Sequence, residues 1–145
     1  IGSGRLQRTV DRRVSELGVR GRFHQIPELA DADRVLDQFD VFVLPSRFEG
    51  APYTPLEAMR AGTPVVLSDV VGNRDVVEPG VSGIVLAEDD IEGMALAVVG
   101  LLSAPGHRAK ITNAARVRLE RYDVRTMGAA LSRLYLDAAQ STRVR

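Results

Sequence analysis

The sequence predicts an α/β fold with a doubly wound parallel sheet, and three observations lead to this prediction. Short apolar runs rich in β-branched residues alternate along the chain with longer segments whose apolar residues recur at helical spacing. The connections between these segments are short, as in folds where each strand is followed by a helix. The chain has 145 residues, enough for one domain that buries roughly 70% of its unfolded surface. We therefore expect a single domain over residues 1–145, with helices on both faces of the sheet.

The amino-terminal segment is expected to begin with a helix over residues 5–17. Its apolar residues recur at helical spacing, and they are Leu6, Val10, Val14 and Leu17. Gly18 follows them and is placed to end the helix. Residues 22–26 are a candidate for a short strand, and residues 31–39 for a second helix. The residues of this second helix that are expected to point inward are Val35, Leu36 and Phe39.

The middle of the chain is expected to hold the centre of the sheet. Residues 41–46 begin with β-branched and aromatic side chains, which is typical of a buried strand, and we interpret them as the central strand. A turn-rich loop leads from this strand to a short helix over residues 54–60, which Gly62 closes. Residues 63–68 form the next apolar strand. Open α/β sheets bind ligands at the carboxyl ends of their strands, so this loop is where we expect function.

The last part of the chain is mostly helical. A turn of helix is expected over residues 72–77, followed by a strand over residues 83–87. Three longer helices are then expected over residues 91–102, 106–121 and 124–140. The final residues, 141–145, are expected to be a frayed tail.

The composition argues against several classes of function. The 19 Lys and Arg residues balance the 19 Asp and Glu residues, so no overall field favours nucleic acid or an anionic membrane. The absence of cysteine excludes disulfides and thiolate metal sites, and the low aromatic content offers little to stack on bases. No apolar run approaches the length of a membrane span. These features predict a cytoplasmic protein with no nucleic-acid partner.

Two glutamates lie eight positions apart in and after the loop, and each has two interpretations. Glu57 comes three residues after Thr54, which would make it part of a capping box in which its side chain returns to the Thr54 amide. Spacing alone favours this structural role over a ligand contact. Glu49 lies in the loop at the end of the strand, where it is either a solvated acid or a ligand contact.

The backbone between the two glutamates is suited to an anionic ligand. Gly50 lets the chain approach a ligand closely, and the first amides of the following helix have no partner within that helix. Pro52 has no N–H to donate. The amides left as donors are those of Gly50, Ala51, Tyr53 and Thr54. A diphosphate flanked by hydroxyl groups would match these donors and both carboxylates, and a nucleotide sugar has that layout.

Several segments, in order along the chain, resemble the signature of glycosyltransferase family 4. They are Gly2-Ser3-Gly4, residues 40–46, Glu49-Gly50, Leu56-Glu57-Ala58-Met59, residues 62–66, residues 73–77 and residues 80–83. Members of that family are retaining enzymes with two Rossmann-like domains, an architecture called GT-B, and their carboxyl-terminal domain holds the nucleotide-sugar donor. The resemblance implies that this chain is such a donor-binding domain, with Glu49 and Glu57 at the positions of the family's paired glutamates.

The resemblance also implies roles for these residues. Glu49, as the catalytic residue, would contact hydroxyls of the transferred sugar, and Glu57 would accept from the ribose hydroxyls. The loop amides would bind the diphosphate of a UDP- or GDP-linked hexose, with no metal and no other cofactor. The anomeric configuration would be retained, and the departing diphosphate would help to deprotonate an acceptor that the sequence does not identify.

Two departures from the family pattern bear on this implication. Relatives carry Gly-Gly and then Glu where this chain has Val71, Gly72 and Asp75, and a valine held at positive φ would be strained. The chain also begins at Ile1 without a starting methionine, and without the diphosphate-binding Arg and Lys of the family or its amino-terminal acceptor domain. We therefore expect a fragment that binds donor weakly and is inactive by itself. In the full-length protein, peripheral contact with the inner face of a membrane would come through the missing domain.

Other candidate sites have simpler interpretations. The pair Asp89-Asp90 before a helix is more typical of a cap than of a metal site. Five arginines are expected on solvated helix faces, namely Arg12, Arg13, Arg116, Arg118 and Arg121. Two other classes of protein stay open as alternatives: a sugar-nucleotide-binding scaffold without activity, and a flavodoxin-like interaction domain. Retention of both Glu49 and Glu57 disfavours each, because neither needs that pair.

Overall fold

The computed structural model describes residues 1–142 and divides into two compact units, Ile1–Ala32 and Asp33–Arg145. In the first unit, α1 (Gln7–Glu16) ends as expected, because Gly18 adopts a left-handed conformation at φ +65°. The Gly18 amide donates to the Ser15 carbonyl at 3.1 Å, which satisfies one of the last carbonyls of the helix.

The strand expected over residues 22–26 does not form. The short 3₁₀ helix η1 (Arg20–Arg22) runs into its start, and one backbone hydrogen bond of 2.8 Å joins the Gly2 amide to the Ile26 carbonyl. A strand needs a continuous ladder with a neighbour, and the described residues of this unit contain no other strand to pair with. The prediction is wrong because an apolar run indicates β propensity, but a strand also needs a neighbouring strand with which to pair.

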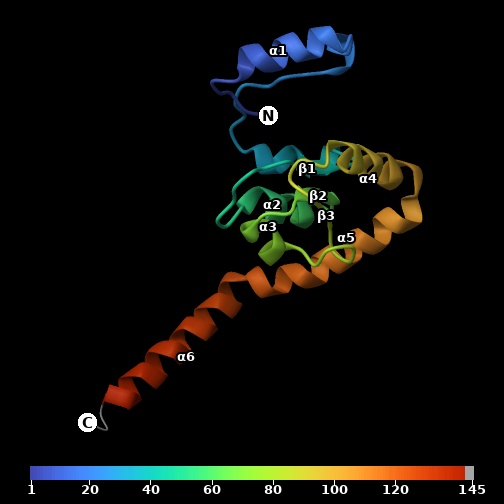
Figure 1. The fold of residues 1–145 in the computed structure, drawn as a ribbon. Helices are drawn as coiled ribbons and strands as arrows, with labels where there is room; N and C mark the ends of the chain where they lie inside the picture. Colours follow the sequence, from blue (N-terminus) through green and yellow to red (C-terminus); the bar gives the residue numbers. More distant parts are fainter. Residues whose placement is uncertain (143–145) are drawn as a thin grey trace. The chain divides into compact units, whose positions relative to one another are not determined.

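The second unit contains a three-stranded parallel sheet in the order β1-β2-β3 (Figure 1). Its strands are β1 (Phe42–Leu44), β2 (Val65–Ser68) and β3 (Ile84–Leu86). Phe42 lies opposite Val65 at the start of the first pair. Because helices connect successive strands, each strand returns in the same direction, which confirms the predicted parallel sheet.

The central strand of this sheet is β2 and not the strand predicted over residues 41–46. All four β2 residues are buried, whereas Val43 of β1 is 40% exposed. Among the described strands, β1 pairs with β2 alone. The two runs look alike in sequence because both are short and apolar. Their order in the sheet depends on pairing partners, which the composition of a single run does not specify.

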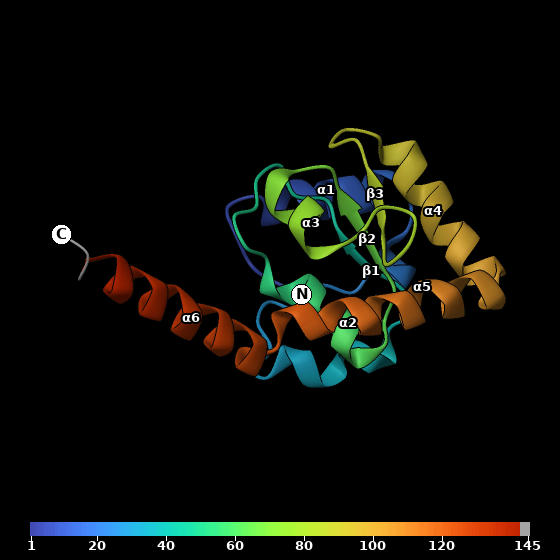
Figure 2. The same cartoon turned by 90° about the horizontal axis from the view of Figure 1, so that it is seen from below.

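Helices connect the strands and cover the sheet (Figures 1 and 2). Five of the helices predicted for this unit end within two residues of their expected positions: α2 (Tyr53–Ala61), α3 (Val71–Val76), α4 (Ile91–Ser103), α5 (Pro105–Leu119) and α6 (Val124–Thr142). The 3₁₀ helices η2 (Ala32–Gln38) and η3 (Glu120–Tyr122) precede β1 and α6. The first replaces the α-helix expected over residues 31–39, and it buries Leu36 but leaves Phe39 45% exposed.

β2 separates two layers of the core, because alternate side chains of a strand point to opposite faces. Val65 and Leu67 pack on one face with Met59 of α2. Val66 packs on the other face with Leu101 of α4, and α5, which runs beside α2, contributes to both layers (Figure 2). Both faces of the sheet are therefore covered by helices, and the predicted doubly wound α/β fold is confirmed.

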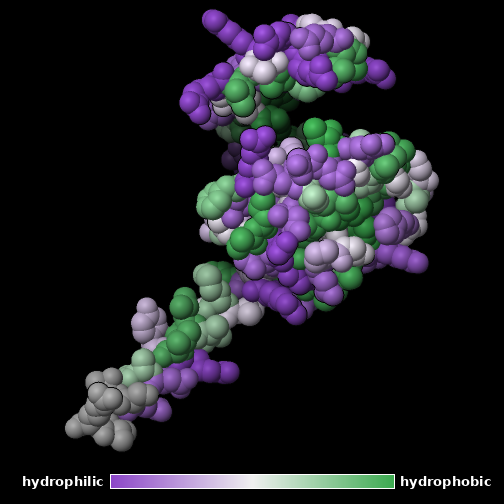
Figure 3. All heavy atoms as spheres, in the orientation of Figure 1, coloured by the Kyte–Doolittle hydropathy of each residue, from purple (hydrophilic) through white to green (hydrophobic). Residues whose placement is uncertain are grey.

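α6 differs from the other helices in its exposure. Every described side chain from Val124 to Gln140 is exposed, and these include large apolar ones such as Leu134 at 66%. Apolar side chains are visible on the surface of this helix (Figure 3). Of the tail predicted over residues 141–145, α6 includes the first two residues, and the last three lie outside the described residues. Within residues 1–142, none of the helices combines the length and the apolar character that crossing a membrane requires.

Truncation of Met59 tests the core. Its side chain is fully buried in the layer that contains Val65 and Leu67, so Met59→Ala removes apolar contacts and leaves a cavity. We expect the free energy of unfolding to fall by about 2–5 kcal/mol in urea titrations followed by circular dichroism. Leu96→Ala, at a side chain 65% exposed on α4, is the matched control and should cost less than about 0.5 kcal/mol. Equal losses in the two variants would contradict this core.

Candidate functional site

The loop between β1 and α2 carries the first predicted site residue, Glu49. Its side chain is half-buried, and the Ser46 hydroxyl donates to Glu49 Oε1 at 2.6 Å. Because Ser46 lies two residues beyond the end of β1, the carboxylate is held at the carboxyl end of that strand. This is the edge of a parallel α/β sheet at which ligands bind.

α3 approaches the backbone of this loop closely at Gly72. The Gly72 amide donates to the Glu49 carbonyl at 3.2 Å. A Cβ atom on Gly72 would lie 2.6 Å from the Gly50 carbonyl oxygen and 2.7 Å from that of Glu49. These separations are shorter than any real Cβ contact, so only glycine allows the two segments to meet.

Val71, the departure from the family's Gly-Gly pattern, is not strained. Among the described residues, the only non-glycine residue at positive φ is Asp31. Val71 instead begins α3 with its side chain 77% exposed. The close approach in this chain therefore depends on Gly72 and not on the residue before it.

The start of α2 differs from the predicted capping box. The helix begins at Tyr53 with Pro52 as its N-cap, and no side chain caps it. Thr54 is thus inside the first turn, where its side chain cannot serve as the N-cap. Glu57 is half-buried, and among the described residues its carboxylate has no hydrogen-bond or ion-pair partner. The capping-box prediction is wrong, and the structure leaves this carboxylate available.

Four amides in this segment have no acceptor among the described residues, and all four belong to exposed residues. They are the amides predicted as donors, those of Gly50, Ala51, Tyr53 and Thr54. The last two open α2, where the helix dipole adds a positive partial charge. Unpaired amides at the start of a helix can bind an anion.

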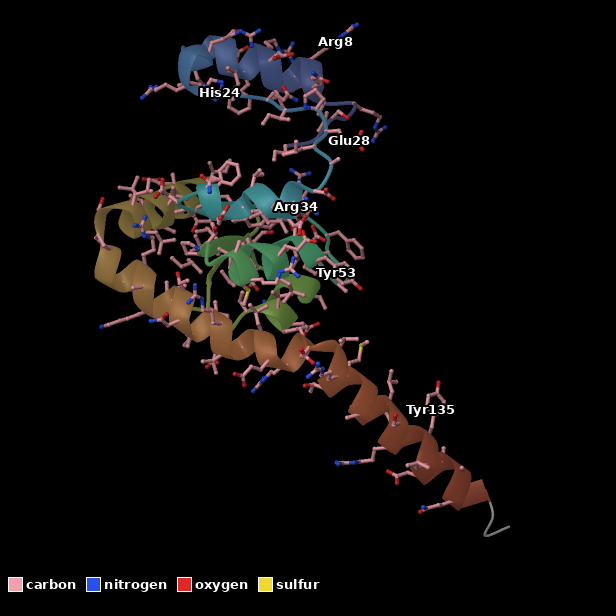
Figure 4. All side chains as sticks on the ribbon, turned by 180° about the vertical axis from the view of Figure 1, so that it is seen from behind. Arg8, His24, Glu28, Arg34, Tyr53 and Tyr135 are labelled. Atoms are coloured by element: carbon pink, nitrogen blue, oxygen red, sulfur yellow. The ribbon has the colours of Figure 1, made fainter. Side chains whose placement is uncertain are left out.

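A groove of about 1260 Å³ brings four of the six predicted site residues together: Gly50, Ala51, Tyr53 and Glu57. Glu49 and Thr54 are not among its lining residues. The other lining residues come mainly from α3, the end of α5, η3 and the start of α6. Tyr53 projects from the start of α2 and is 75% exposed (Figure 4).

Arginines contribute most of the positive charge of this groove. The lining arginines are Arg60, Arg116, Arg121 and Arg125. Arg60 also donates to Asp33 at 3.1 Å, so part of this charge is neutralised. Among residues 1–142, no group of three or more His, Cys, Asp or Glu side chains is arranged to hold a metal ion. Four carboxylates line the groove as well, those of Glu57, Asp75, Glu120 and Asp123, so it offers amides, guanidinium groups and carboxylates to a polar ligand.

Two residues that the sequence did not mark as important hold the end of α3. Arg118 donates from Nε to the Val76 carbonyl at 2.6 Å and from Nη2 to the Asp75 carbonyl at 2.8 Å, and the Tyr122 hydroxyl donates to the Asp75 carbonyl as well. These bonds satisfy carbonyls that a helix end leaves unpaired. The expectation that Arg118 is solvated is wrong, because its side chain is only 16% exposed. No local pattern signals contacts between residues more than 40 positions apart.

The other departure from the family pattern, Asp75, lies on α3 and lines the groove. Arg74 of α3 pairs through both its Nε and Nη2 groups with Asp69, which lies before the start of the helix. The hydrogen bond from Arg74 lowers the pKa of Asp69 below its ordinary value. α3 is thus fastened to its neighbours by a pair near its start and by Arg118 and Tyr122 at its end.

A second hollow of about 430 Å³ lies at the opposite end of the sheet, because its lining residues Asp40 and Pro64 precede β1 and β2. Two of its charged side chains are paired with each other, because Arg108 donates to Asp40 at 3.0 Å. At the start of α4, Asp90 accepts from the Gly93 amide at 2.8 Å, which confirms its predicted role as a cap. Neither feature contains a predicted site residue.

Comparison with protein families relates the chain to enzymes of sugar transfer. The family model described as glycosyl transferases group 1 matches residues 1–118. The glycogen synthase of Mycobacterium tuberculosis is 36% identical over 110 residues. That match covers 75% of this chain and 27% of the glycogen synthase, so the chain spans about a quarter of that relative's length.

Comparison with solved structures confirms the fold. The crystal structure of Anabaena HepE in complex with UDP has a TM-score of 0.84 at 23% identity, covering 90% of this chain and 36% of that one. The carboxyl-terminal domain of a Francisella tularensis glycosyl transferase group 1 protein has a TM-score of 0.73 at 19% identity, covering 82% of this chain and 63% of that one. The predicted Rossmann-like carboxyl-terminal half of a GT-B architecture is therefore correct.

Substitution of Gly72 tests the close approach of α3 to the loop. Gly72→Ala places a Cβ against two carbonyl oxygens, so we expect it to displace the loop and lower the free energy of unfolding by about 1–3 kcal/mol. Gly100→Ala on α4 is the control, because nothing lies within 4 Å of its Cβ, and it should stabilise the helix by about 0.5–1 kcal/mol. A neutral Gly72→Ala would contradict the contact.

Proposed function

Because this chain belongs to the glycosyl transferases of group 1, we propose that it is the donor-binding domain of a retaining hexosyltransferase of glycosyltransferase family 4. The donor is a nucleoside diphosphate sugar. One observation carries the proposal: in the described part of the chain, four amides without an acceptor, all in exposed residues, lie between two carboxylates after β1. Amides suit a diphosphate, and carboxylates suit the hydroxyl groups on either side of it.

The amides of the loop and of the first turn of α2 bind the diphosphate in this proposal. Glu57 accepts from the ribose hydroxyls, which fits a half-buried carboxylate that lines the groove and has no protein partner among the described residues. Anabaena HepE has been crystallised with UDP and with UDP-glucose, which supports a nucleotide-sugar donor for this chain. The donor is UDP- or GDP-linked, and no metal or other cofactor takes part.

Glu49 acts on the transferred sugar. One of its carboxylate oxygens accepts from Ser46, which leaves the other to accept from a sugar hydroxyl near the reacting carbon. As the bond to the diphosphate breaks, positive charge develops on the sugar ring, and a nearby carboxylate stabilises it. The acceptor hydroxyl attacks the reacting carbon of the sugar on the face from which the diphosphate leaves, and the departing diphosphate takes the proton of that hydroxyl. The configuration of the carbon is therefore retained.

In this proposal, the acceptor site and part of the diphosphate site lie outside this chain. An amino-terminal domain supplies the acceptor site, and an Arg and a Lys from the segment before Ile1 neutralise the diphosphate. The exposed apolar side chains of α6 are consistent with a helix that packs on that domain. By itself, the chain binds donor weakly and does not complete transfer.

Calorimetric titration tests nucleotide binding. UDP, GDP and ADP are titrated into the full-length protein and into its Glu57→Ala variant. We expect one nucleotide to bind, and the variant to bind it about 10- to 100-fold more weakly, because the ribose hydroxyls lose a charged acceptor. Glu120→Ala, which removes another carboxylate of the same groove, is the control and should change affinity by less than about threefold. Unchanged affinity in Glu57→Ala would contradict the ribose contact.

Hydrolysis of the donor tests the catalytic role of Glu49. The assay needs no known acceptor, because the sugar is transferred to water. In the full-length protein we expect Glu49→Gln to lower kcat at least about 100-fold while the affinity for the free nucleotide changes less than about threefold. The reason is that Glu49 acts on the sugar and not on the nucleotide. Parallel losses of kcat and nucleotide affinity would show that Glu49 is a general binding group.

A further inference from the structure

A buried polar network lies behind the loop that carries Glu49. Ser68, the last residue of β2, and Asn73 of α3 are both fully buried, at 0% exposure. Buried polar side chains are retained only where they make hydrogen bonds, because desolvation without them is unfavourable. The contacts of these two residues therefore indicate what the network holds in place.

The network joins the carboxyl ends of β1 and β2. Asn73 Nδ2 donates to the Ser68 carbonyl at 2.9 Å, and the Ser68 hydroxyl donates to the Ser46 carbonyl. The Ser46 hydroxyl in turn donates to Glu49 Oε1 at 2.6 Å. A continuous series of contacts thus runs from α3 through the end of β2 to the carboxylate.

The backbone of Glu49 is held by α3 as well. Its carbonyl accepts from the Gly72 amide at 3.2 Å, next to Asn73 on α3. Two contacts therefore fix the position of Glu49, because Ser46 holds its carboxylate and α3 holds its main chain. A half-buried loop acid without a site to serve does not require this support.

Asn73 shows that the network is not arranged for stability alone. Among the described residues, its Oδ1 atom is buried and has no hydrogen-bond partner. An unpaired buried acceptor destabilises a protein, so an asparagine at this position is unfavourable unless its donor contact is needed. The donor contact that it makes is the one to Ser68.

We propose that Ser46 is a positioning residue for Glu49, and that Ser68 and Asn73 hold Ser46 in the orientation that this requires. The inference rests on the proposed function, because it assigns Ser46 a role through the carboxylate that acts on the sugar. The hydroxyl of Ser46 occupies one carboxylate oxygen and aims the other towards the donor. Loss of the hydroxyl frees the side chain to take several rotamers, and only some of them reach the sugar.

Three variants of the full-length protein test the proposal, with hydrolysis of UDP-glucose, GDP-mannose and ADP-glucose as the assay. The donor that the wild type hydrolyses is then used throughout. We expect Ser46→Ala to lower kcat about 10-fold while calorimetric affinity for the free nucleotide changes less than twofold. Ser46→Thr keeps a hydroxyl at the same position and should retain kcat within about threefold.

Ser82→Ala is the matched control for loss of a buried serine. Ser82 is 2% exposed, and its hydroxyl accepts from the Glu78 amide at 2.8 Å in the turn before β3, at the opposite end of that strand from the site. Its removal should lower the melting temperature without changing kcat. Ser46→Ala and Ser82→Ala then separate a positioning role from a purely structural one.

The proposal is overturned if Ser46→Ala leaves kcat unchanged, or lowers kcat and nucleotide affinity in parallel, while Glu49→Gln is still impaired. That pattern would remove the role of Ser46 and leave the proposed function intact. If instead the wild type hydrolyses none of the three donors and binds none of their nucleotides, both the proposed function and the role of Ser46 are overturned.

Discussion

The candidate site depends on one close approach, that of Gly72 in α3 to the Glu49–Gly50 backbone. Its amide donates to the Glu49 carbonyl, and no side chain larger than hydrogen fits between the two segments. The contact joins the element after β2 to the loop after β1. Arg118 and Tyr122 fix the far end of the same helix, so α3 is a rigid support for the loop.

This support lets one short loop present different groups to one ligand. β2 is the buried central strand of the sheet. Its last residue, Ser68, donates to the Ser46 carbonyl beyond the end of β1. Amides that have no acceptor within residues 1–142 then lie between Glu49 and Glu57, in exposed residues. A flexible loop would have to lose conformational entropy on binding, whereas this one is held in place before the ligand arrives.

Much of the fold could be predicted from the sequence because it depends on local signals. Apolar periodicity and glycines such as Gly18 and Gly62 located the helices to within a few residues. The errors concern pairing: the centre of the sheet, the missing strand at residues 22–26 and the half-buried Arg118 all depend on partners far along the chain. The site residues were found from spacing and resemblance, but the capping box failed because the helix starts at Tyr53, which puts Thr54 inside the helix and not at its N-cap. Ser46, Ser68 and Asn73 could not be recognised, because small polar residues give no sequence signal of burial.

The central claim is the position of the diphosphate. The most direct test is a crystal structure of the full-length protein with the nucleoside diphosphate that it binds. The account predicts phosphate oxygens within hydrogen-bond distance of the amides of Gly50, Ala51, Tyr53 or Thr54, and a ribose hydroxyl on the Glu57 carboxylate. A nucleotide bound in the hollow beside Arg108 at the opposite end of the sheet, or one that leaves these amides free, would contradict it.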